Sequence, residues 1–116
     1  MPAGQEDLVI EQGAEFRNRW LVQGFDLTGY TAAMQIRKSV KESTTQFDLT
    51  TENGGITITP LIDSTPDSAV DIHITDDATA ANVESSGVYD VKMIPPNGED
   101  WFLVRGKVKY IAEVTR

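Results

Sequence analysis

The stretch GVYDVKMIPPNGEDWFLVRGKVKYIAEVT, residues 87–115, decides the fold, because apolar and polar residues alternate through almost all of it. In its first half Tyr89, Val91 and Met93 fall on one face, and Asp90 and Lys92 fall on the other. The segment PPNG at 95–98 is a strong turn signal. Because successive side chains of a strand point to opposite faces, this period of two predicts a β-hairpin.

The second arm of this hairpin is unusually long, and we expect it to bend at Gly106, where no side chain is present. The even-numbered residues from Phe102 to Val114 form the predicted core face. The opposite face mixes apolar and basic residues, so it is either a second buried layer or a surface that packs on another subunit. The pattern runs almost to Arg116, so an edge strand there would be free to pair with a neighbour. The interface candidates are Trp101, Leu103, Arg105, Lys107, Lys109, Ile111, Glu113 and Arg116.

Length and composition restrict the classes of function. The 116 residues suffice for one domain, and the absence of cysteine removes disulfides and thiolate metal sites. The formal net charge of −8 disfavours direct binding to nucleic acid, whose phosphates require a basic surface. We find no signal peptide and no apolar run long enough to span a membrane. We therefore expect proteins, and neither nucleic acids nor membranes, as partners.

The remainder of the chain predicts more short strands. Residues 1–7 are expected to form a flexible arm, and residues 8–116 a single domain. Thr75 or Asp76 is a suitable N-cap for one helical turn before the final hairpin. Turn signals recur about every ten residues, which favours an all-β, antiparallel, immunoglobulin-like β-sandwich of about seven to nine strands. No parallel pairing is expected, because no helical crossover of adequate length is present. The further strand candidates are 8–11, 15–22, 30–37, 46–50, 56–59 and 70–75.

Few residues suggest catalysis or metal binding. His73 is the single histidine, and on a strand it is expected to be a solvent-facing residue. Glu99 and Asp100 are adjacent acids at a turn, where solvation is the ordinary outcome. We therefore predict no enzyme activity, no cofactor and no resident metal. Calcium binding by the acidic group is the alternative, although its spacing is not that of an EF-hand, and this group comprises Asp63, Asp67, Asp71, Asp76 and Asp77.

Several motifs along the chain carry a resemblance to a known family, and they are IEQGAEF (10–16), DLTGYTAAMQIRKS (26–39), GGITIT (54–59), HITDDATAA (73–81), SGVYDVKMIPPNGE (86–99) and LVRGKVKYIAEVTR (103–116). Together they resemble small β-sandwich proteins of tailed bacteriophages and prophages. The similar families include N-terminal domains of baseplate upper proteins and tail-fibre adaptor proteins. The resemblance implies a non-enzymatic structural protein of the virion. It would act in the tail, baseplate or fibre junction, after assembly in the host cytoplasm. Its partners would be other virion proteins, with homo-oligomers or a symmetric array of copies.

Two other functions remain open on the sequence. A capsid decoration protein could have the same build, and copy number per particle would distinguish it from a tail protein. A carbohydrate-binding module is the third hypothesis, since Trp20, Trp101 and Tyr110 have rings that can stack on sugars. Trp20 and Tyr110, however, fall on predicted core faces.

Overall fold

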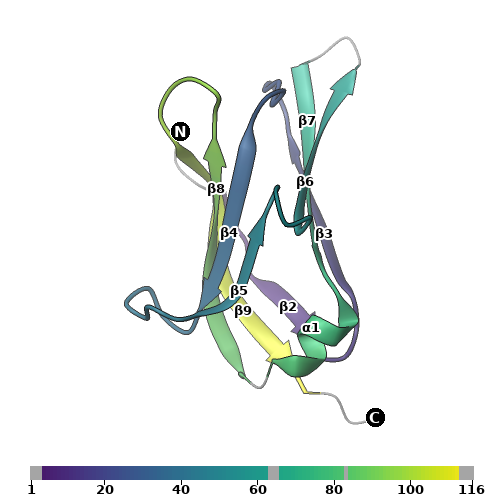
Figure 1. Ribbon diagram of the computed structural model, residues 1–116, viewed down its shortest axis with the longest axis vertical. Helices are drawn as coiled ribbons and strands as arrows, with labels where there is room; N and C mark the ends of the chain where they lie inside the picture. The colour runs from purple at the N-terminus through teal and green to yellow at the C-terminus, as the bar shows by residue number, and fades with distance from the viewer. Residues whose placement is uncertain (1–3, 63–65, 83, 113–116) are drawn as a thin grey trace.

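The alternating segments form a two-layer β-sandwich in the computed structural model, which describes residues 4–62, 66–82 and 84–112 (Figure 1). This confirms the predicted all-β sandwich, with nine strands and one short helix in the described part. The elements are β1 (Gly4–Gln5), β2 (Leu8–Glu11), β3 (Phe16–Val22), β4 (Thr31–Arg37), β5 (Thr45–Thr50), β6 (Ile56–Ile62), β7 (Pro66–Ile74), α1 (Asp76–Ala81), β8 (Ser86–Ile94) and β9 (Trp101–Ile111).

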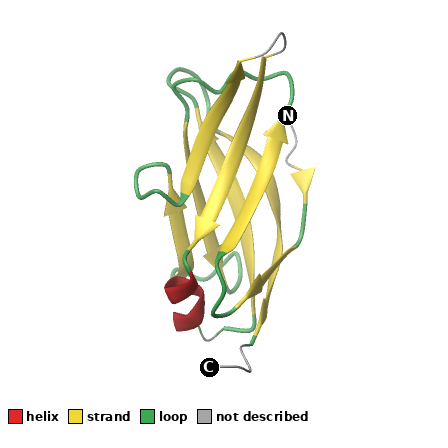
Figure 2. Ribbon diagram, turned by 90° about the vertical axis from the view of Figure 1, so that its right-hand side faces the viewer, coloured by secondary structure: helices red, strands yellow, loops and turns green. Residues whose placement is uncertain are grey.

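The two layers are unequal in size. The larger sheet has six strands in the order β1-β9-β8-β4-β5, with β2 also paired to β9, and the smaller has the order β3-β7-β6. The predicted hairpin is β8 and β9, which pair in antiparallel fashion. Pro60 lies in β6, an edge strand of the smaller sheet, where a residue without an N–H is tolerated. In Figure 2 the strands run along the length of the molecule and the helix lies at one end.

The core lies between the sheets and uses the predicted alternation. In β4 the residues alternate between intermediate and buried, and β8 follows the same rule. Burying these apolar faces supplies the main free energy that favours folding. The fully buried side chains of the two sheets include Ile10, Met34, Ile36, Ile72, Val91 and Met93.

The turn DLTG closes one end of the sandwich. Leu27 is 1% exposed, and its backbone N–H donates to Ser68 Oγ over 3.0 Å. Gly29 has φ +83°, a conformation that glycine adopts without steric cost. Asp26 Oδ1 accepts hydrogen bonds from the hydroxyl and the N–H of Thr28, and these bonds lower the pKa of Asp26. Leu27 therefore plugs this end of the sandwich, and Gly29 supplies the backbone conformation that the turn requires.

The short helix α1 closes the other end and begins as predicted at the N-cap Thr75. Its buried Thr79 hydroxyl donates to Ala14 O over 2.8 Å and accepts from Gly13 N over 3.1 Å. One side chain therefore satisfies two backbone groups of the β2–β3 connection, groups that are costly to bury without a partner.

Parallel pairing is present, and the prediction of a purely antiparallel sandwich was wrong in this respect. Both β1 and β2 run parallel to β9, with Gly4 opposite Val104 and Leu8 opposite Val108. A crossover helix is needed only when parallel strands are close in sequence. Here the whole chain between β2 and β9 makes the connection. The absence of a crossover helix from the sequence pattern therefore did not exclude parallel pairing of these two strands.

The segment expected to be a flexible arm, residues 1–7, is bound to the sheet from Gly4 onward. Glu6 N donates to Arg105 O over 3.1 Å, and Asp7 Oδ1 accepts from Lys107 N over 3.0 Å. Gly106 lies between these two anchors, and a Cβ there would approach Glu6 O to 2.0 Å. Gly106 is therefore needed for close approach of the N-terminal segment.

Candidate functional site

The outer face of the larger sheet carries the candidate site. Polar and small residues of β4 and β8 alternate with the core residues and so face away from the other layer. Ala33 and Lys92 pair across these two strands, and so do Gln35 and Asp90. The outward positions of β9 continue this surface with Arg105 and Lys107.

A β-bulge in β9 determines which aromatic residue reaches this outer face. Val91 pairs with Val104 but Lys92 pairs with Phe102, so Leu103 is the extra residue. The bulge reverses the faces of the residues before it. Phe102 therefore lies beside the outward Lys92, and Trp101 lies opposite the buried Met93. The predictions that Phe102 is a core residue and that Trp101 faces outward were wrong.

Trp101 contributes to the interior of the molecule instead. Its ring centroid lies 5.5 Å from that of Phe25 and 6.3 Å from that of Tyr30, and the side chain packs against the hydrophobic core. Leu103 is also partly buried against that core. These two interface candidates therefore stabilise the monomer and provide little surface for a partner.

An open groove of about 680 Å³ lies on the outer face and is called the sheet-face groove below. Its apolar lining includes Ala33, Val88 and Phe102, all partly exposed. Its volume is within the range of clefts that bind ligands or protruding side chains of a partner. The charged residues that line it are Arg37, Asp90, Lys92, Arg105 and Lys107.

The four basic side chains of the groove differ in whether a carboxylate pairs with them. The Arg105 guanidinium carbon lies 5.2 Å from the centroid of the Phe102 ring, a cation–π contact. Arg37 donates to Gln35 Oε1 and to the backbone carbonyl of Glu42. Lys92 Nζ lies 3.5 Å from Asp100 Oδ2. The ion pairs in the described ranges include none formed by Arg37, Arg105 or Lys107.

The remaining predicted interface residues have mixed positions. Arg105, Lys107, Lys109 and Ile111 are exposed on the larger sheet, and the first two line the groove. Glu113 and Arg116 lie outside the described residues. The prediction that the last strand forms an open edge was wrong, since β9 has β8 on one side and β1 and β2 on the other.

Sequence reasoning did not select most of the residues that line the groove, among them Phe102, Arg37 and Lys92. Phe102 was assigned to the wrong face because a bulge is invisible in the pattern of one strand. Arg37 and Lys92 lie outward on neighbouring strands, and their alternation with buried residues was already visible. Comparing the outward residues of all candidate strands, instead of those of the last strand alone, would have grouped the basic side chains.

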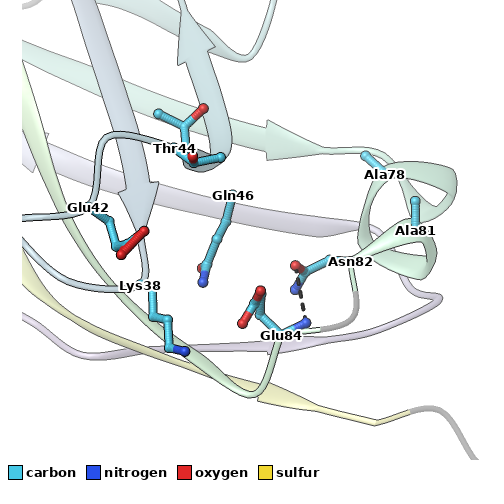
Figure 3. A pocket seen from close by; sticks show the side chains of 9 residues that line it. Lys38, Glu42, Thr44, Gln46, Ala78, Ala81, Asn82 and Glu84 are labelled. Atoms are coloured by element: carbon cyan, nitrogen blue, oxygen red, sulfur yellow. Dashed lines mark hydrogen bonds between the residues drawn. The ribbon is translucent and has the colours of Figure 1, made fainter.

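A second, smaller opening of about 340 Å³ lies near α1, between the β4–β5 loop and the connection to β8 (Figure 3). Gln46 anchors it, since its Oε1 accepts from the Tyr110 hydroxyl over 2.8 Å and its Nε2 donates to Ser86 O over 3.0 Å. Burial, and then the charge of Glu84, raises the pKa of Tyr110. Asn82 Nδ2 is buried there with no hydrogen-bond partner among the described residues, while Asn82 Oδ1 accepts from Glu84 N. The described residues that line this polar opening include no apolar anchor comparable to Phe102.

The possible metal and histidine sites are dispersed. His73 Nε2 lies 3.4 Å from Glu15 Oε1 at the partly exposed surface of the smaller sheet. Asp71 is paired with Arg19 over 2.7 Å, and this bond raises the pKa of Arg19. Asp67 Oδ1 accepts from Gly24 N, and Asp63 lies outside the described residues. Within the part of the chain that the structure describes, no group of three or more acidic or histidine side chains is arranged to hold a metal ion.

The aromatic residues considered for sugar binding are occupied by internal contacts. Trp20 stacks on Tyr89 with ring centroids 6.3 Å apart, and its Nε1 donates to Glu6 Oε2 over 2.6 Å. Trp101 packs against the core, and Tyr110 is only 6% exposed. The three rings therefore do not form a common exposed platform.

Comparison with known proteins gives no relative: no protein-family model matches the chain, and no curated protein does. Over the described residues, none of the helical structure is long and apolar enough to cross a membrane.

Proposed function

We propose that this protein is a non-enzymatic structural component of a bacteriophage virion that works through contacts with neighbouring subunits. Its place would be in the tail, the baseplate or a tail-fibre junction. The proposal combines the motif resemblance, which covers nearly the whole chain, with a surface suited to contact. It does not require a catalytic residue, a cofactor or a metal.

The sheet-face groove is the observation that carries the proposal. A partly exposed aromatic ring with an arginine stacked on it combines two residue types that are enriched at protein interfaces, where such residues contribute most to binding. Both side chains project from β9. Phe102 is paired with Lys92 of β8, and Arg105 is paired with Asp90 of β8 and with Gln5 of β1, so backbone pairing fixes their positions. A rigid surface binds with a smaller loss of conformational entropy than a mobile loop.

The test is the protein composition of purified phage particles produced by the host that carries the gene. We expect peptides of this chain to co-purify with intact particles through a density gradient and to be identified by mass spectrometry. The number of copies of this chain per particle, measured relative to a known tail protein, then indicates its location. A copy number that matches the number of subunits in the capsid shell would indicate capsid decoration instead. If the chain stays with the soluble lysate proteins and is absent from infectious particles, the proposed function is wrong.

A further inference from the structure

The sheet-face groove differs in charge from the rest of the molecule. The chain has ten basic and 18 acidic residues, and the groove is lined by four of the basic ones and by a single acid, Asp90. The remainder therefore contains six basic and 17 acidic residues. A basic groove is thus surrounded by an acidic molecule, and the two parts are electrostatically complementary.

The charge of the groove is available for a partner. Arg105 is stacked on Phe102, and Arg37 is bonded to a side-chain amide and a backbone carbonyl. Among the described residues, neither guanidinium forms an ion pair with a carboxylate. The backbone N–H of Lys107 donates to Asp7 Oδ1 over 3.0 Å, and the residue is exposed and lines the groove. Cations held beside apolar surface gain more from an incoming carboxylate than cations that are surrounded by water.

We infer that the sheet-face groove binds the acidic surface of a second copy of this chain. This inference rests on the proposed function, in which copies are arrayed in the particle. The groove does not bind the groove of the other copy, because two grooves placed face to face would bring eight cations together and repel. It binds a different, acidic part of the next copy, either reciprocally in a two-fold dimer or head to tail in a ring or an open array.

The first experiment compares two charge-reversal variants by sedimentation velocity over a concentration series. Arg105→Glu with Lys107→Glu leaves two cations and three acids in the groove lining, in place of four cations and one acid. Lys38→Glu with Lys41→Glu changes the net charge equally at exposed positions outside the groove. We expect wild type and the Lys38/Lys41 variant to self-associate, and the groove variant to do so about tenfold more weakly or not at all. Circular dichroism checks that each variant folds.

The second experiment maps the contact in the unmodified protein. Equal amounts of ¹⁴N- and ¹⁵N-labelled chain are mixed and treated with a carbodiimide, which joins lysine amines to carboxylates in contact. We expect mixed-isotope links from Lys92 or Lys107 to acidic residues of another copy. Links confined to single chains, such as Lys92 to Asp100, would overturn the inference, as would a monomer at every concentration or equal association of the two charge variants.

These outcomes are separable from those of the proposed function. A chain that is found in particles but does not associate with itself refutes the inference and leaves the virion role intact. A chain that forms groove-dependent arrays but is absent from particles refutes the virion role and leaves the inference intact.

Discussion

Replacement of Gly106 by alanine is expected to release the N-terminal segment from the edge of the larger sheet. The new Cβ would lie 2.0 Å from Glu6 O and 2.7 Å from Glu6 C, far inside contact distance and against backbone that cannot rotate away. Relief therefore requires movement of the segment itself. The hydrogen bonds at risk are Glu6 N to Arg105 O, Tyr89 Oη to Glu6 O, Lys107 N to Asp7 Oδ1 and Trp20 Nε1 to Glu6 Oε2.

The magnitude follows from these four bonds. Each is worth about 0.5–1.5 kcal/mol net of the bonds to water that replace it, so the loss of all four should lower the free energy of unfolding by about 2–6 kcal/mol. That is a large fraction of the roughly 5–15 kcal/mol of a typical domain. Urea unfolding measures the loss. Hydrogen exchange of the Glu6 and Lys107 amides shows whether the segment has left the sheet.

Gly4→Ala is the matched control. Gly4 lies in the same segment, but a Cβ there has only Leu103 O nearby, at 3.6 Å, which is an ordinary contact. We expect this variant to unfold like wild type. The reasoning would be refuted by a Gly106→Ala protein that keeps both amides protected and stays within about 0.5 kcal/mol of wild type, the range of a neutral surface change.

Two further predictions concern buried hydroxyl groups. Thr79→Val should lower the free energy of unfolding by about 1–3 kcal/mol, because Gly13 N and Ala14 O lose their shared partner, whereas Thr79→Ser should retain most of it in the same urea titration. Burial raises the pKa of Tyr89 and of Tyr110. Above about pH 10 the unfolded chain therefore loses phenolic protons that the folded protein keeps, so the free energy of unfolding should fall as pH rises. Phenylalanine at either position should flatten that decline in unfolding experiments between neutral and alkaline pH, and an unchanged slope would contradict the assignment.

The sequence was sufficient to predict those features of the fold that depend on a single segment of the chain. Tyr89, Val91 and Met93 are all buried in β8, as their spacing indicates. The N-cap at Thr75 was also predicted, because it depends on local backbone geometry. These features need no knowledge of which strand lies next to which.

Features that depend on the partner strand could not be predicted. Trp101, Phe102 and Leu103 are three consecutive apolar residues, so their pattern does not indicate which of them face the core. Only the pairing with β8 reveals the extra residue in β9. In the same way, residues 8–11 indicate which side chains face the core but not that β9 is their neighbour. Register and strand order arise from the packing of the whole sandwich.

The candidate site was only half predicted for the same reason. Arg105 and Lys107 were selected from one strand, but the groove is made by several strands, and Arg37 and Lys92 join it only through pairing. The basic cluster is therefore a property of the sheet. It has no counterpart as a block of basic residues in the sequence.

The N-terminal segment and the sheet-face groove are parts of one structural unit. The two backbone anchors of the segment are Arg105 O and Lys107 N, which belong to the two cations at the centre of the proposed contact. Gln5 of the same segment also lines the groove. Because Gly106 permits both anchors, the residue that lets the segment approach also fixes the backbone from which the two cations project. The edge of the sheet thus orients the surface that we propose for assembly, and what seemed a flexible arm from Gly4 onward is part of the site.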